Sequence, residues 1–131
     1  MMWGMSNLTI TVYGITNCDT VKKARTWLAS RSLDYQFHDF KKHGVPADKL
    51  TTWVAAVGWQ KLVNRQGTTW RKLGTDAQTA VTDAETAQTL MRNLPSVVKR
   101  PVVEWTAMGT TRITVGFDAL QWESSLDMPS E

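Results

Sequence analysis

Residues 11–25 read Thr-Val-Tyr-Gly-Ile-Thr-Asn-Cys-Asp-Thr-Val-Lys-Lys-Ala-Arg and contain Cys18, the only cysteine in a chain of 131 residues. Alternating β-branched and apolar side chains over residues 8–13 predict a strand, which Gly14 ends. Apolar residues recur at helical spacing over residues 19–30, so Cys18 lies where a strand leads into a helix. The unpaired amides and the positive dipole end of a helix N-terminus favour the thiolate form of such a cysteine.

The pattern continues with a second short strand and then a run of helices. Residues 35–40 alternate in strand fashion, and a strand, a helix and a second strand in this order predict a parallel β-α-β unit. Pro46 suits the first turn of a helix that Gly58 ends, and residues 59–73 predict one or two brief helices. Residues 82–85 have the spacing of a capping box, with Thr82 as the cap of a helix that closes before Pro95.

The last third of the chain changes character. Residues 101–105 and 112–115 predict two strands joined by a hairpin turn at 108–111, and residues 118–125 predict a terminal helix. The order is therefore β-α-β, helices, then β-β-α, which describes an α/β fold: a small mixed sheet with a helical insertion. We expect one domain over residues 8–126 and a disordered tail over 127–131.

Composition indicates a globular protein of the cytoplasm. The chain is 42% hydrophobic and 21% charged, with a net charge of +3 and cations spread in short pairs, which suits a small anion better than nucleic acid. One cysteine excludes a secreted disulfide framework, and the N-terminus lacks the features of a signal peptide. We expect a cytoplasmic monomer that binds neither a membrane nor nucleic acid.

Three interpretations of Cys18 compete. A buried, inert cysteine is one, although the neighbouring residues are polar and form turns. A phosphatase loop of the pattern Cys-x5-Arg is another, but its arginine would fall at Ala24 instead of Arg25. The third is a thiol-transfer site of thioredoxin-like architecture, in which Pro101 is a cis-proline that brings its loop against the thiol. Because position 21 is Val21, a dithiol cycle is excluded.

The chain resembles the ArsC/Spx family, and the YffB-like branch most of all. The resemblance rests on residues 14–18 with the following basic helix, on Leu-Val-Asn-Arg-Gln-Gly-Thr-Thr-Trp-Arg-Lys-Leu at 62–73, and on Val-Lys-Arg-Pro-Val-Val at 98–103. It implies a thioredoxin-like sheet with a helical insertion. In the arsenate reductases of this family a single cysteine attacks the oxyanion, arginines bind it, and glutathione with glutaredoxin resolves the intermediate.

Carried over by position, the resemblance makes Cys18 the nucleophile and Arg100 an anion-binding residue beside Pro101. Arg65 falls close to the middle arginine of the family, although the match can slip by one residue onto Asn64. We group Arg65, Arg100 and Pro101 with Thr16 and Asn17 of the cysteine loop as substrate-binding residues. No metal site and no bound cofactor are expected.

The resemblance also shows a departure. The third arginine of the reductases, which follows the final hairpin, is missing from residues 114–118, and Arg112 comes three or four positions early. We therefore expect a glutathione-dependent monothiol reductase or transferase, with glutathione as co-substrate, a small anionic substrate, and glutaredoxin as a candidate partner. The alternatives are an Spx-like regulator that binds RNA polymerase and a true arsenate reductase.

Seven tryptophans are a high count for this length. Trp27 and Trp53 fall on the apolar faces of predicted helices, where we expect them to be part of the core. Trp59, Trp70 and Trp105 are instead candidates for the lining of a groove.

Overall fold

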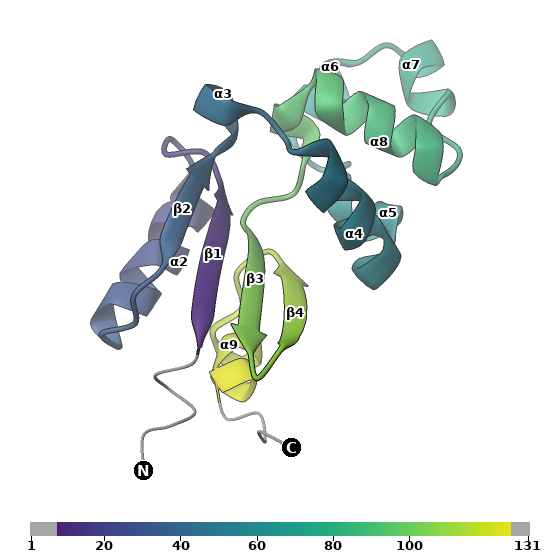
Figure 1. The fold of residues 1–131 in the computed structure, drawn as a ribbon. Coiled ribbons are helices and arrows are strands. Elements are labelled where there is room, and N and C mark those ends of the chain that lie inside the picture. Colours follow the sequence, from purple (N-terminus) through teal and green to yellow (C-terminus); the bar gives the residue numbers. More distant parts are fainter. Residues whose placement is uncertain (1–7, 127–131) are drawn as a thin grey trace. The chain divides into compact units, whose positions relative to one another are not determined.

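The computed structural model describes residues 8–126 and divides into two compact units, each with its own elements. We call residues 8–39 with 100–126 the sheet unit, and residues 40–99 the helical unit (Figure 1). The helical unit contains the segment that was predicted to be helical. It begins at Phe40, which was predicted to end the second strand but instead starts the short helix α3 (Phe40–His43). The prediction that all of residues 8–126 form one domain stays a prediction, and the predicted tail at 127–131 lies outside the described residues.

The sheet unit is built on four strands in the order β2-β1-β3-β4 (Figure 1). Their bounds are Thr9–Gly14 for β1, Gln36–Asp39 for β2, Val102–Ala107 for β3 and Thr110–Val115 for β4. β1 and β2 are parallel and are joined by helix α2 (Asp19–Ser30), whereas β1 pairs antiparallel with β3, and β3 with β4. Helix α9 (Ala119–Leu126) follows β4. The predicted α/β fold, with its parallel β-α-β unit and final β-β-α, is confirmed.

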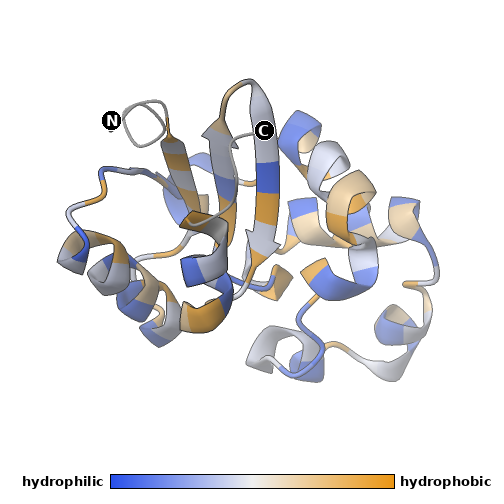
Figure 2. Cartoon of the chain, turned by 90° about the horizontal axis from the view of Figure 1, so that it is seen from below, coloured by the Kyte–Doolittle hydropathy of each residue, from blue (hydrophilic) through white to orange (hydrophobic). Residues whose placement is uncertain are grey.

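One face of this sheet forms a hydrophobic core with helices α2 and α9. Strand alternation places Ile10 and Val12 of β1 beside Trp105 and Val103 of β3. The core also takes Ala24 and Leu28 from α2 and Trp122 from α9. Along the strands in Figure 2, hydrophobic segments in orange alternate with more polar ones, because successive side chains of a strand point to opposite faces of the sheet.

Trp105 is part of this core and does not line a groove. Its side chain is 3% exposed, and its indole Nε1–H donates to the Thr114 hydroxyl at 3.0 Å. The prediction for Trp105 was wrong because only the strand register shows which face each residue takes, and here Trp105 lies opposite Ile10.

The β3–β4 hairpin is tighter than predicted. β3 runs to Ala107 and β4 begins at Thr110, so only Met108 and Gly109 form the turn. Both have positive φ, 56° and 78°, as the favoured two-residue hairpin turns require.

The helical unit consists of short helices around a compact core. Its elements are α3 (Phe40–His43), α4 (Ala47–Val57), α5 (Trp59–Leu62), α6 (Thr68–Lys72), α7 (Thr75–Thr79), α8 (Ala84–Asn93) and the 3-10 turn η1 (Pro95–Val97). Leu50 and Trp53 of α4 are fully buried, as are Ala87 and Met91 of α8. Gly58 ends α4 with φ 87°, as predicted, and residues 59–73 contain the two brief helices α5 and α6.

The cap of α8 is shifted by one residue from the prediction. Asp83, not Thr82, is the N-cap, and its carboxylate accepts a hydrogen bond from the Thr86 backbone N–H at 2.9 Å. The Thr86 hydroxyl accepts in return from the Asp83 backbone N–H at 3.1 Å. A reciprocal Asp–Thr pair replaces the expected Thr–Glu pair, because Asp is at least as good a cap as Thr.

No helix within residues 8–126 combines the length and the apolar character needed to cross a membrane.

Candidate functional site

Cys18 occupies the N-cap position of helix α2. Its backbone is extended, with φ −148° and ψ 121°, and its carbonyl oxygen accepts the first helical hydrogen bond from Lys22 N–H at 2.9 Å. The residue is partly buried, while Thr16 and Asn17 before it are exposed. A cysteine at the rim of a helix N-terminus is reachable by a reactant, which an inert core cysteine is not.

Close packing behind the loop holds the start of α2 against strand β1. A Cβ atom at Gly14 would lie 2.8 Å from Cγ2 of Val21, a separation shorter than van der Waals contact. Val21 is fully buried in the first turn of α2. Because Gly14 has no side chain, the first turn of α2 can pack directly against the end of β1. This packing fixes the position of Cys18 relative to the sheet.

The strand register brings the Arg100-Pro101 segment to the same sheet edge as Cys18. Val102 pairs with Tyr13, so Pro101 precedes β3 at the edge where β1 ends and the cysteine loop begins. The Arg100–Pro101 peptide bond is cis, as expected from the sequence. The Pro101 carbonyl accepts from Gly116 N–H at 2.8 Å, which ties this segment to the end of β4. Arg100 and Cys18 thus leave adjacent strands at one edge.

The position that a phosphatase loop would give to arginine is closed. Ala24 is fully buried in the core of the sheet unit. Arg25, the next residue, donates from Nε to the Tyr35 hydroxyl at 2.9 Å and lies with its guanidinium carbon 4.1 Å from the Phe37 ring centroid. The side chain is therefore engaged with residues of and beside β2, and the phosphatase interpretation stays excluded.

Arg65 lies in the helical unit, on the exposed turn between α5 and α6. Its guanidinium carbon is 5.4 Å from the Trp59 ring centroid, a cation–π distance. Asn64 serves the turn itself, because its side-chain oxygen accepts from Gln66 N–H at 3.2 Å. The resemblance left Asn64 and Arg65 open as the match to the middle arginine of the family, and of these two only Arg65 carries a positive charge. Its part in substrate binding stays a prediction.

A buried polar pair, not foreseen from the sequence, lies on the sheet face away from α2. The Tyr13 hydroxyl donates to Oε1 of Glu104 at 2.9 Å, and the His38 ring lies 5.1 Å from the Tyr13 ring. Glu104 is 9% exposed. The available signal was a single acidic residue inside the apolar strand Val-Val-Glu-Trp at 102–105.

A hollow of about 420 Å³ along helix α2 was also not foreseen. Its lining residues are Lys22, Lys23, Thr26, Trp27, Ser30 and Phe117. All six belong to the sheet unit, and we call this feature the α2 hollow. Within residues 8–126, no cluster of three His, Cys, Asp or Glu side chains is placed to hold a metal ion.

Comparison with known proteins agrees with this architecture. The model of the ArsC family matches residues 13–125. The solved structure of YffB (PA3664) protein is 44% identical, with a TM-score of 0.81 over 89% of this chain and 98% of the other. An arsenate reductase (ArsC) related protein from Brucella melitensis is 45% identical, with a TM-score of 0.67 over 92% and 96% of the two chains. The global transcriptional regulator Spx of Streptococcus pyogenes is 22% identical over 83% of this chain and 78% of its own length.

Proposed function

Because this chain belongs to the ArsC family, we propose that it is a glutathione-dependent monothiol reductase or transferase with Cys18 as its nucleophile. The observation that carries the proposal is the partly exposed Cys18 at the N-cap of α2, at the sheet edge that it shares with Arg100 and the cis-Pro101. A helix N-terminus stabilises negative charge on a thiolate, and an arginine at the same sheet edge attracts an anionic reactant.

The proposed reaction has two exchange steps. The Cys18 thiolate attacks one sulfur of a substrate disulfide, a new S–S bond forms to Cys18, and the other half leaves as a thiolate. Glutathione thiolate then attacks the substrate sulfur of this mixed disulfide, which restores the Cys18 thiolate and releases a glutathione–substrate disulfide. The second thiol must come from outside because the chain has only one cysteine.

The residues around the thiol receive the following roles. Arg100 holds a carboxylate or oxyanion of the reactant. Arg65, which belongs to the helical unit, is a candidate for a second cation only through the family resemblance. Thr16 and Asn17, both exposed, and Pro101 contact the reactant beside the thiol. We place the reaction in the cytoplasm, where a reduced glutathione pool is available and a free cysteine persists.

Replacement of the nucleophile tests this proposal. Cys18→Ser should abolish glutathione-dependent disulfide reduction, because an alcohol of high pKa does not replace a thiolate, while the far-ultraviolet circular dichroism spectrum stays unchanged. Intact-mass spectrometry after exposure to oxidised glutathione should show one adduct on the native chain and none on the variant. A serine variant with full turnover would exclude the assignment.

Arsenate reduction is a narrower alternative within the same enzyme class. Arg112, the nearest arginine to the missing third position, pairs with Trp105 inside the hairpin, three residues before the end of β4. Three strand residues correspond to about 10 Å, which keeps Arg112 away from the sheet edge of Cys18. A parallel turnover assay with arsenate should therefore give no product under conditions in which the glutathione adduct forms.

The likeness to Spx supports a second candidate, a regulator that binds RNA polymerase. A Cys-x-x-Cys switch would need a cysteine at position 21, where Val21 is buried against Gly14. The regulator would therefore work without such a switch. Retention of polymerase subunits by the immobilised native chain and by Cys18→Ser alike would favour this candidate over the enzyme.

A further inference from the structure

The α2 hollow combines an apolar, aromatic wall with two positive charges. Trp27 of α2 and Phe117 of the β4–α9 loop are its aromatic lining residues. Lys22 and Lys23 lie on the same helix toward its N-terminus, and no acidic side chain is among the lining residues. The chemistry of the surface therefore suits a ligand that combines negative charge with an apolar group.

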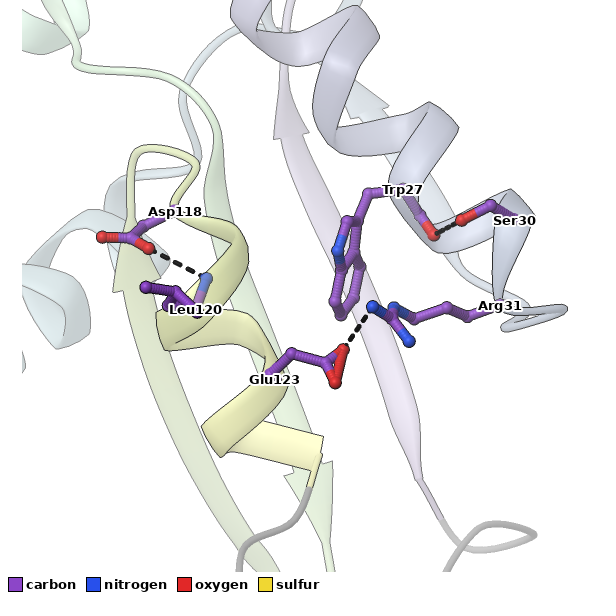
Figure 3. A network of polar contacts seen from close by, with 6 residues as sticks. All are labelled: Trp27, Ser30, Arg31, Asp118, Leu120 and Glu123. Carbon is purple, nitrogen blue, oxygen red and sulfur yellow. Dashed lines mark hydrogen bonds and ion pairs between the residues drawn. The ribbon is translucent and has the colours of Figure 1, made fainter.

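The aromatic wall is held in place by its own contacts. The Trp27 ring meets Trp122 edge-on at 5.5 Å between centroids and Phe117 at 6.5 Å. The Arg31 guanidinium lies 4.2 Å from the centroid of the Trp27 ring and forms an ion pair with Glu123 of α9. Figure 3 shows the Trp27 ring beside this ion pair, between α2 and α9. A wall that is already ordered loses little side-chain entropy when a ligand covers it.

The helix that lines the hollow starts at the proposed nucleophile. Lys22 is one helical turn beyond Cys18, and its backbone N–H donates to the Cys18 carbonyl. Trp27 is nine residues from Cys18, a rise of about 14 Å along a helix. An extended peptide covers this distance with about four residues. A polypeptide joined to Cys18 through a disulfide can therefore lie along α2 and reach the aromatic wall.

Glutathione does not match the whole surface. As γ-glutamyl-cysteinyl-glycine it has carboxylates for the lysines, but it has no apolar side chain for Trp27 and Phe117. A longer segment that carries acidic residues followed by an aliphatic or aromatic side chain matches both parts. The apolar wall thus favours a protein reactant over the tripeptide.

We propose that the α2 hollow is the docking site for an acidic polypeptide segment of a protein thiol that exchanges disulfides with Cys18. The segment places an apolar side chain against Trp27 and Phe117 and its carboxylates beside Lys22 and Lys23. This inference rests on the proposed function, since it names a partner for the same thiol.

Competition between tethered peptides tests the docking site. The native chain is converted to its Cys18–glutathione disulfide and equilibrated with acetyl-Cys-Gly-Glu-Glu-Leu-amide, whose thiol displaces glutathione and forms the new disulfide. Intact-mass spectrometry gives the ratio of the two adducts. We expect an exchange constant about fivefold higher for this peptide than for the same peptide with Ser in place of Leu or with Lys in place of both Glu, because docking raises the effective concentration of the tethered thiol.

Two variants on the same helix provide the matched control. Thr26→Glu puts a negative charge among the lining residues and should remove the preference for the acidic Leu peptide. Ala29→Glu adds the same charge at an exposed α2 position outside the lining and should keep it. Equal exchange constants for all peptides on the native chain would overturn the docking site while the glutathione adduct, and with it the proposed function, stands. Absence of any adduct on Cys18 would overturn both.

Discussion

Gly14 shows how one missing side chain positions a reactive one. Its α-carbon lies against Val21, so the helix that carries Cys18 starts directly above the end of β1. Cys18 itself makes no side-chain cap for α2, and only its carbonyl takes part in the helix. The thiol is therefore left for chemistry while the backbone around it is fixed by packing.

Gly14→Ala should lower the free energy of unfolding by about 1–3 kcal/mol, because the new methyl group overlaps the buried Val21 side chain and forces a local shift. Urea denaturation measures the loss. Gly74→Ala is the matched control, since a Cβ at Gly74 meets no atom within 4 Å, and it should cause no such loss. Equal destabilisation by the two substitutions would contradict the packing argument.

At the scale of single elements, helix α8 shows how a cap outweighs a sequence pattern. The stretch Thr-Asp-Ala-Glu at 82–85 satisfies a capping-box spacing with Thr82, yet the helix begins one residue later, at Ala84. The backbone N–H of Thr86 holds the pKa of the Asp83 carboxyl below its ordinary value of 3.8, with a smaller contribution from the Thr86 hydroxyl. The charged form is thus the one that caps the helix.

Because the folded-state pKa of Asp83 is lowered, its charge stabilises the fold above the unfolded pKa of 3.8, and this contribution is lost as the pH falls through the folded-state value. Thermal unfolding followed from pH 6 down to about 2 should show this loss in the native chain. Asp83→Asn keeps a capping oxygen without the charge, so it should flatten this part of the pH profile, whereas Asp83→Ala should destabilise at all pH values. An unchanged profile in Asp83→Asn would contradict the assignment.

At the scale of the whole molecule, the core of the sheet unit joins segments that are far apart in the chain. Trp122 of α9 is fully buried and meets the rings of Trp27, Trp105 and Phe117 nearly at right angles. These residues come from α2, β3 and the loop after β4. The terminal helix therefore closes the core, and it also orders the aromatic wall of the α2 hollow.

Trp122→Ala should reduce the stability of the protein by about 3–5 kcal/mol, because it opens a large cavity in this core. Trp122→Phe should cost much less, since it keeps an aromatic ring and removes an indole N–H that has no hydrogen-bond acceptor among the described residues. Urea denaturation of the two variants gives the comparison. Equal losses of unfolding free energy in the two variants would show that the aromatic ring of Trp122 does not supply the packing stability of this core.

Local signals account for the elements that the sequence predicts well. The strand, glycine and helix around Cys18, the parallel β-α-β unit and the end of α4 at Gly58 depend on periodicity and on residues that break it, which act over a few positions. The thioredoxin-like interpretation of Cys18 adds the cis bond at Pro101, which is observed. The expected roles of Arg65 and Arg100 stay predictions.

The sequence by itself determined the order of the strands and of the longer helices and the lone thiol at a helix start, because each depends on residues close together in the chain. Three separate motifs indicated the family. Only the tertiary structure decided that Trp105 is buried, that Glu104 bonds to Tyr13, and that Phe117 meets Trp27 beside two lysines. Such pairings depend on strand register and on helix packing across about 90 residues, and no local pattern encodes which distant side chain will be the neighbour.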